Sequence, residues 1–259
     1  MLAIIGGSSL NELPHVKITR RQVVRTPYGE PSCGLTFGDI NGLDVVFLAR
    51  HGYAHTLQPH EINYRANIWA LAEQKVSRII SVGSVGGIRK DLKPGTLVVP
   101  DQLIDYTYGR ANTFFEGSLQ PVRHVDFTDP YTPDARSCIL LAARRQGIPV
   151  VDGGTYACTQ GPRLETAAEI RRLEGDGADM VGMTGMPEAV LARELGVPYA
   201  TICLVGNYAA GKGENKHHID IGAATQILDD HMQQVLSILG AICADEFCAL
   251  SGSAAAVAE

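Results

Sequence analysis

Residues 178–205, ADMVGMTGMPEAVLARELGVPYATICLV, hold the pattern that decides the fold: an apolar run, a helical stretch and a second apolar run. Short apolar runs bounded by glycine or proline are typical of buried strands, so we expect strands near 178–182 and 198–205. Pro187 suits the first turn of a helix expected over 187–195. Such alternation predicts an α/β fold with a mainly parallel central sheet.

The same alternation extends along the rest of the chain. Further strands are expected near 2–5, 35–37, 44–48, 78–83, 97–104 and 150–158, and further helices near 61–74, 134–146, 165–174 and 221–248. The turn at 39–42 predicts a hairpin, and the polar segment 105–132 has the length of a functional loop. Without a repeat or a linker, we expect a single domain over 1–248 and a flexible tail over 249–259.

Composition limits the classes of function. The 259 residues carry a net charge of −6, which does not suggest a nucleic-acid-binding surface. No apolar run is long enough to cross a membrane, and the N-terminus lacks the basic region of a signal peptide. The six cysteines are scattered without metal-binding spacing, which predicts reduced thiols and a cytoplasmic location.

Ligands of such sheets bind beyond the carboxyl ends of the strands, so residues just after strands are the candidates. Gly6-Gly7-Ser8-Ser9 can offer amides and hydroxyls to an anion, or form a plain turn. Arg50 offers a planar fork to phosphate or carboxylate, and His51 can donate to the same anion. The alternative for this pair is an Arg–Glu ion pair with a packed histidine.

Four later segments have the same position and the same ambiguity. Gly83-Ser84-Val85-Gly86-Gly87 predicts a small-residue turn with free amides. Thr184 can cap the next helix or bind an anion, and Met183 can pack in the core or lie under a ligand. The Glu165 carboxylate can stabilise the N-terminus of the helix that follows it, or accept an N–H from a ligand. Asn207 ends an apolar strand, where it can be part of a turn or can form hydrogen bonds with the edge of a flat ring.

Seven motifs in this order resemble a known family. They are GGSSL (6–10), ARHG (49–52), HEINYRANIWAL (60–71), GSVGG (83–87), QGPRLET (160–166), GMTGMPE (182–188) and the strand end Gly206-Asn207-Tyr208. Over roughly residues 2–240 the chain resembles the trimeric purine nucleoside phosphorylases and methylthioadenosine phosphorylases. The resemblance implies one α/β domain with a mixed, partly barrel-like sheet flanked by helices. It also implies a homotrimer with sites near subunit interfaces, and cleavage of purine nucleosides by phosphate.

The resemblance also assigns roles at the phosphate and ribose ends. The phosphate-binding residues it implies are Ser8, Arg50, His51, Ser84 through its backbone amide, and Thr184. Met183 is expected beneath the ribose, and His124 is expected to reach the 5′ end of the nucleoside in a neighbouring subunit. Two positions depart from relatives: Ser8 replaces threonine, and Gly83 replaces a polar side chain.

The base end separates the subfamilies. Relatives that cleave 6-aminopurines carry aspartates where this chain has Asn207 and Ala209, and Asn207 can instead donate to O6 and engage N7 of a 6-oxopurine. Glu165 stands where 6-oxopurine enzymes carry a carboxylate for the N1 proton, which adenine lacks. We therefore expect Asn207 and Glu165 to be catalytic. Leu164 and Tyr208 are expected to contact the base as well.

The 5′ end is predicted to be apolar. Ile219, Ile221 and Ala224 fall where enzymes for ordinary nucleosides carry a histidine, and an apolar wall prefers a 5′-methylthio group over a hydroxyl. The expected substrate is S-methyl-5′-thioinosine, with phosphate as co-substrate and neither metal nor organic cofactor. The alternatives are a general inosine/guanosine phosphorylase, a methylthioadenosine phosphorylase and a non-catalytic purine-binding protein. A dinucleotide oxidoreductase is disfavoured because GxGxxG is missing after the first strand.

Overall fold

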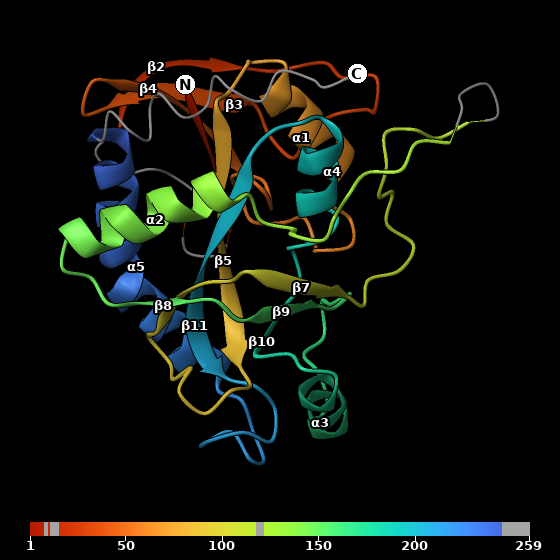
Figure 1. The fold of residues 1–259 in the computed structure, drawn as a ribbon, viewed down its shortest axis with the longest axis vertical. Helices are drawn as coiled ribbons and strands as arrows, with labels where there is room; N and C mark the ends of the chain where they lie inside the picture. The colour runs from red at the N-terminus through yellow and green to blue at the C-terminus, as the bar shows by residue number, and fades with distance from the viewer. Residues whose placement is uncertain (8–9, 11–15, 118–121, 245–259) are drawn as a thin grey trace.

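Strand β5 (Arg78–Gly87) lies at the centre of the fold and organises the sheet (Figure 1). β1 (Leu2–Gly6) runs parallel to its first half, and β11 (Tyr199–Tyr208) runs parallel along its other side. β10 (Met180–Gly182) pairs antiparallel with the last two residues of β5. The computed structural model describes residues 1–7, 10, 16–117 and 122–244.

Three branches leave β5 and together form an eleven-stranded mixed sheet. The first continues from β1 through β4 (Leu43–Ala49), β3 (Leu35–Ile40) and β2 (Lys17–Gln22); the second from β10 through β9 (Thr155–Cys158) and β7 (Gln102–Asp105); the third from β11 through β6 (Leu97–Val99) and β8 (Val150–Asp152). The expected mixed α/β architecture is confirmed, because parallel and antiparallel pairs occur in the same sheet.

The predicted hairpin is also confirmed. β3 and β4 pair antiparallel, with Ile40 opposite Leu43 across a two-residue loop. Asn41 and Gly42 adopt φ angles of 54° and 85°. Asparagine and glycine tolerate this left-handed backbone better than other residues, which is why the Asn-Gly pair is a strong hairpin signal.

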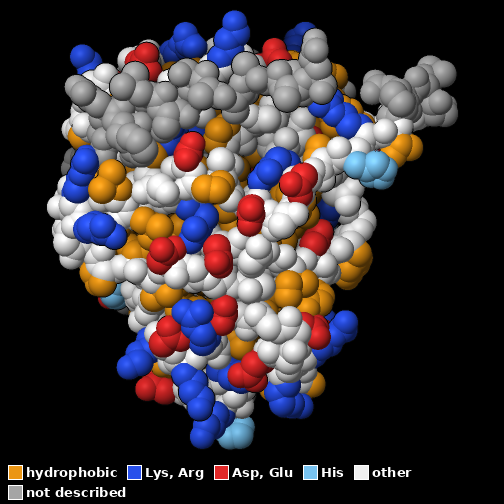
Figure 2. Space-filling view, in the orientation of Figure 1, with side chains coloured by type: hydrophobic (Ala, Val, Ile, Leu, Met, Phe, Trp, Pro, Cys, Tyr) orange, Lys and Arg blue, Asp and Glu red, His pale blue; other side chains and the backbone are white. Residues whose placement is uncertain are grey.

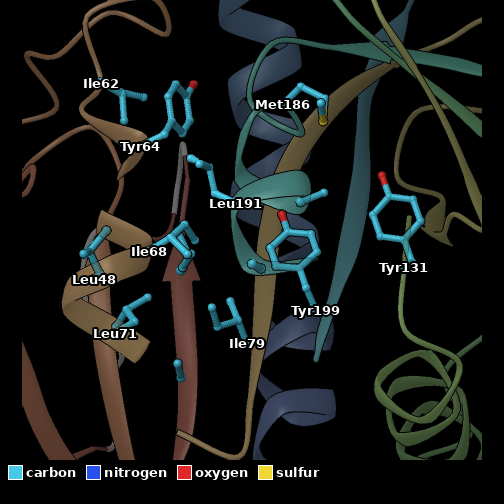
Figure 3. Packing of buried hydrophobic residues seen from close by; sticks show 14 of the residues in the cluster. Leu48, Ile62, Tyr64, Ile68, Leu71, Ile79, Tyr131, Met186, Leu191 and Tyr199 are labelled. Atoms are coloured by element: carbon cyan, nitrogen blue, oxygen red, sulfur yellow. The ribbon is translucent and has the colours of Figure 1, made fainter. Parts of the chain in front are cut away.

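Five helices are present among the described residues and cover the sheet: α1 (Tyr64–Ala72), α2 (Pro133–Arg145), α3 (Ala167–Gly175), α4 (Glu188–Glu194) and α5 (Ile221–Ala244). α1 packs against α4, α2 packs against α5, and α3 stands apart near the end of β10 (Figure 1). Buried side chains from several elements fill the space between α1, α4 and the sheet. Figure 3 shows Leu48 of β4, Ile68 of α1, Leu191 of α4 and Tyr199 of β11 converging there. This packing fixes α1 and α4 against the sheet.

Some sequence predictions about strands are wrong, each for a local reason. The expected turn at 83–87 is the second half of β5, because its glycines are held by β11 on one side and β10 on the other. The expected strand 97–104 is interrupted at Pro100-Asp101, and the expected strand 150–158 at Gly153-Gly154. Proline and glycine weaken strand interiors, so both breaks have a cause in the sequence. β2 was not predicted, because all six of its residues are exposed.

One gap in the sheet positions the functional site. The register with β1 ends at Ser81 and the register with β10 begins at Gly86. Among the described strands, residues 82–85 of β5 therefore have no partner on this side. Backbone groups left unpaired within a sheet need other hydrogen-bonding partners. The guanidinium of Arg50 supplies one, since its Nη1 donates to the carbonyl of Val82 at 3.1 Å.

Basic and acidic side chains are interspersed over the face in Figure 2. This mixture is typical of a solvated protein surface. No helix among the described residues is long and apolar enough to span a membrane.

Candidate active site

A cavity of about 320 Å³ opens at the gap beside β5. Its volume is in the range of small-molecule sites. Twelve of the residues expected from the sequence line it: Arg50, His51, Ser84, Leu164, Glu165, Met183, Thr184, Asn207, Ala209, Ile219, Ile221 and Ala224. Residues from strand ends, two loops and the start of α5 thus come together in one place. Ser8 lies outside the described residues.

Arg50 follows β4 and is almost completely buried. Its Nε and Nη2 donate to the two carboxylate oxygens of Glu188 at 2.6 and 2.9 Å, and Nη2 also donates to Oγ of Ser81 at 2.6 Å. Burial alone would lower the Arg50 pKa, but the charge and hydrogen bonds of Glu188 outweigh it and raise that pKa above its usual value. Hydrogen bonds to described residues use four of the N–H groups, which leaves the fifth, on Nη1, for a ligand.

The Arg–Glu pair that the sequence left as an alternative is therefore present, and Arg50 also lines the cavity. The close approach of Gly7 shows which part of the guanidinium is accessible. A Cβ at Gly7 would lie 2.9 Å from Nη1 of Arg50, so only glycine leaves this nitrogen uncovered. Glu188 thus holds the side chain while Nη1 faces the cavity.

His51 is oriented by a main-chain carbonyl. Its Nδ1 lies 2.8 Å from the carbonyl oxygen of Leu57, which can only accept, so Nδ1 carries the hydrogen. Burial, followed by the positive charge of Arg50, lowers the pKa of His51 to about 4. At neutral pH the ring is uncharged, and Nε2 carries a lone pair. Such a ring accepts the O–H of a monoprotonated anion, such as monohydrogen phosphate.

Thr184 lines the same cavity as Arg50 and His51, and so does the part of β5 that has no partner among the described strands on the side of β1 and β10. A Cβ at Gly83 would lie 3.9 Å from Oγ1 of Thr184, so the glycine leaves space beside this hydroxyl. Ser84 lines the cavity from within β5 and not from a turn. Thr184 does not cap α4, whose first cap position is Pro187 without a side-chain hydrogen bond. Its hydroxyl is therefore free for a ligand.

Asn207 follows a bulge in β11, where the pairing with β5 shifts between Val205 and Asn207. Bulges re-aim side chains beside active sites. The Asn207 amide nitrogen donates to the carbonyl of Tyr208 at 2.6 Å, which fixes which end of the amide is nitrogen. Asn215 donates to the same carbonyl at 2.7 Å. One N–H and the oxygen of Asn207 are then available to a ligand.

Glu165 and Met183 complete the middle of the cavity. Oε1 of Glu165 accepts the hydroxyl of Thr159 at 2.6 Å, which orients the carboxylate and leaves Oε2 for a ligand. A Cβ at Gly161 would lie 2.5 Å from the sulfur of Met183, and Gly161 has a φ of 61°. Only glycine therefore lets the Met183 side chain occupy this place. The helix cap belongs to Thr166, which forms a capping box with Glu169.

The first turns of α5 form an apolar wall with Ile219. Sequence reasoning found Ile221 and Ala224 but missed Thr225 and Leu228, which also line the cavity. The four helical residues stand at i, i+3, i+4 and i+7, so helical periodicity was the signal that could have found them. The Thr225 hydroxyl donates to the carbonyl of Ile221 at 2.9 Å, so its hydrogen is used inside the helix.

Two expected contact residues do not line the cavity. The Tyr208 side chain packs against Gly213, and Tyr208 acts on the site only through the carbonyl that holds Asn207. His124 is exposed and lies away from the cavity of its own chain. Within the part of the chain that the structure describes, no group of three or more His, Cys, Asp or Glu side chains could hold a metal ion.

Comparisons with known proteins identify the family of this chain. The phosphorylase superfamily matches residues 1–240. A probable S-methyl-5′-thioinosine phosphorylase of Pseudomonas syringae pv. tomato is 49% identical over 240 residues, covering 93% of this chain and 97% of that protein. A 6-oxopurine nucleoside phosphorylase of Pyrococcus furiosus is 50% identical over 220 residues, covering 83% and 82%.

Solved structures give the same result for the fold. Methylthioadenosine phosphorylase from Schistosoma mansoni, in complex with adenine, superposes with a TM-score of 0.89 at 33% identity. The match covers 94% of this chain and 90% of that one. The expected resemblance is confirmed: the chain belongs to the phosphorylase superfamily and is related over most of its length to nucleoside phosphorylases.

Proposed function

We propose that this protein is a pentosyltransferase that cleaves S-methyl-5′-thioinosine with phosphate, giving hypoxanthine and 5-methylthioribose 1-phosphate. One observation carries the proposal: Asn207 and Glu165 line the same cavity as the apolar residues Ile219, Ile221 and Leu228. The first pair matches a 6-oxopurine, and the apolar residues match a methylthio group. The names of the relatives from Pseudomonas syringae and Pyrococcus furiosus support the same substrate class.

Phosphate is assigned to the corner formed by Arg50, His51, Thr184 and the backbone near Ser84, with Ser8 as a further ligand. Arg50 supplies the fixed positive charge, and Thr184 supplies a hydroxyl. Because neutral His51 offers an acceptor, it suits the single P–OH of monohydrogen phosphate. Phosphate held in this way has one oxygen directed at C1′ of the ribose, which rests on Met183.

The purine is assigned to Glu165 and Asn207, with Leu164 and Ala209 beside it. As the C1′–N9 bond breaks, electron density moves into the ring. The free N–H of Asn207 donates to O6, its side-chain oxygen accepts the proton that N7 takes up, and Glu165 accepts the N1–H. A phosphate oxygen forms the new bond to C1′ with inversion. The proton of monohydrogen phosphate ends on the released base, so charge and atoms balance. Positioning and electrostatic stabilisation suffice for this reaction.

The proposal includes a cytoplasmic homotrimer without a resident cofactor. Leu164 and Ile221 at the cavity mouth are 41% and 67% exposed, and Val122 beside His124 is 83% exposed. A neighbouring subunit that places His124 at the 5′ end would cover these apolar groups. This arrangement rests on the family resemblance and on that exposure.

The test is a phosphate-dependent cleavage assay with inosine, adenosine, methylthioinosine and methylthioadenosine, followed by release of the free base. We expect methylthioinosine to have the highest kcat/KM, and arsenate to replace phosphate. Preference for methylthioadenosine would contradict the assignment of Asn207 and Glu165. Purine binding without any cleavage would leave a binding protein on this fold.

The second candidate is a general 6-oxopurine nucleoside phosphorylase. It is favoured by the 50% identity to the Pyrococcus furiosus protein of that name. In this candidate Asn207 and Glu165 keep their roles, but the apolar wall at the 5′ end does not select a methylthio group over a hydroxyl. Inosine cleaved as well as methylthioinosine in the same assay would establish it.

A further inference from the structure

Arg110 lies in the long segment between β7 and α2 and does not line the cavity, yet its guanidinium contacts two segments that do. The guanidinium forms six hydrogen bonds. Nε donates to Oε1 of Gln160 (3.2 Å), and Nη2 donates to the carbonyls of Thr159 (3.3 Å) and Gln160 (2.8 Å). Nη1 donates to the Tyr64 hydroxyl (3.2 Å) and to the carbonyls of Met183 (2.9 Å) and Met186 (2.5 Å).

Through these bonds Arg110 joins the base end of the cavity to its ribose and phosphate end. Thr159 holds the Glu165 carboxylate through its hydroxyl, while its carbonyl accepts from Arg110. Met183 and Met186 flank Thr184, and both of their carbonyls accept from the same Nη1 atom. The two segments are separated in sequence, and Arg110 bonds directly to both.

The partners are main-chain carbonyls and not carboxylates. All four carbonyls belong to the two loops, so a shorter side chain would leave acceptors unpaired at the site. The guanidinium is a rigid planar fork with five N–H groups, whereas lysine is a single flexible point charge. The pattern therefore requires the shape of arginine, in addition to its charge.

We propose that Arg110 is a positioning residue that sets the distance between Glu165 and Met183 for the reaction proposed above, on which this inference rests. Arg50 is held separately by Glu188, Ser81 and the carbonyl of Val82. Loss of Arg110 should therefore loosen the base and ribose contacts most, and affect phosphate binding only through the segment that carries Thr184, because Arg50 keeps its own partners. A purely structural role would instead reduce the amount of folded enzyme and alter neither KM.

The experiment compares the wild type with Arg110→Ala, Arg110→Lys and the control Arg172→Ala. Arg172 is an exposed arginine on α3 whose ion pair with Asp176 lies outside the cavity. For Arg110→Ala we expect the nucleoside kcat/KM to fall on the order of 100-fold, as small misplacements do. The nucleoside KM should rise, and the phosphate KM should stay within about threefold, since Arg50 is unaffected.

Free guanidinium provides the decisive readout. Added at about 50 mM, far below the molar concentrations that unfold proteins, it should restore activity to Arg110→Ala at least about tenfold and leave the wild type and Arg172→Ala unchanged. Arg110→Lys should stay impaired. Full activity of Arg110→Lys would overturn the proposal. So would a loss in Arg110→Ala confined to kcat, with both KM values unchanged and no rescue.

Failure of the proposed function is separable from failure of this inference. If the wild type cleaves no nucleoside, hypoxanthine binding by calorimetry replaces the kinetic readout. Weaker binding by Arg110→Ala that guanidinium restores would support the positioning role without the reaction. Equal binding by both proteins, or none by the wild type, would overturn it.

Discussion

Nε of Arg50 lies 2.6 Å from Oε1 of Glu188, although 138 residues separate them in sequence. Both side chains are almost inaccessible to solvent, with exposures of 1% and 0%. The Tyr199 hydroxyl donates to Oε2 of the same carboxylate at 2.8 Å. The cation that faces the proposed phosphate site is thus fixed from behind by a buried anion and a buried phenol.

Replacing Glu188 by glutamine should destabilise the protein strongly, because it leaves the Arg50 charge buried without its partner. Breaking such a pair typically costs about 3–5 kcal/mol, which urea unfolding would measure. Tyr199→Phe is the matched milder change, since it removes one hydrogen bond to Glu188 and should cost about 1–3 kcal/mol. Unchanged unfolding of Glu188→Gln would mean that the ion pair does not stabilise the fold.

Asn207→Asp should weaken cleavage of 6-oxopurine nucleosides, because the carboxylate cannot donate to O6. One such donor is worth about 2–4 kcal/mol, a factor of order tens to thousands in kcat. Asn215→Asp is the control, since Asn215 donates to the same Tyr208 carbonyl but does not line the cavity. Equal losses in the two variants would assign the effect to that carbonyl and not to the base.

Ile221→His should raise the kcat/KM for inosine relative to methylthioinosine, because an imidazole can bond a 5′-hydroxyl where isoleucine favours an apolar group. Gains from a single added hydrogen bond are about 1 kcal/mol, roughly fivefold in the ratio. Ile18→His on β2 places the same change on another exposed isoleucine and serves as control. A ratio that does not move would remove Ile221 from the 5′ end.

His51 predicts a pH dependence of stability. Its pKa is about 4 in the folded protein and near 6.5 when unfolded, so between these values the unfolded chain binds more protons. Stability should therefore fall as pH decreases through this window. The linkage relation predicts that the free energy of unfolding falls by about 2 kcal/mol between pH 7.5 and pH 5. Urea unfolding at both pH values should show this drop in the wild type and a smaller one in His51→Asn; identical drops would contradict it.

The sequence was informative wherever one local signal decided the structure. The hairpin follows from Asn41-Gly42, which accept a left-handed backbone. Eight of the twelve lining residues found in advance lie in the family motifs, Ala209 directly follows one of them, and the other three, Ile219, Ile221 and Ala224, lie at or just before the start of α5. Thr225 and Leu228 could have been found from the helical periodicity of the residues that follow Ile221.

Other features could not be predicted from the sequence, because they depend on contacts with distant parts of the chain. The glycines of 83–87 have the composition of a turn, but pairing with β10 and β11 makes them strand. Arg110 gives no signal in a polar loop, since its six bonds are made with segments about 46 to 76 residues away. His51 is oriented by the carbonyl of Leu57, a partner that the ARHG motif did not indicate.

The sequence by itself determined the alternation of strands and helices, the family and the residue types available to the purine and to phosphate. These depend on local propensity and on motifs that need no partner. Only the tertiary structure decided that Glu188 holds Arg50, that residues 82–85 have no partner among the described strands on the side of β1 and β10, and that Arg110 joins both ends of the cavity. The reason is physical: hydrogen bonds and buried ion pairs form between groups that are close in space, and the sheet that brings them together is fixed by packing of the whole chain.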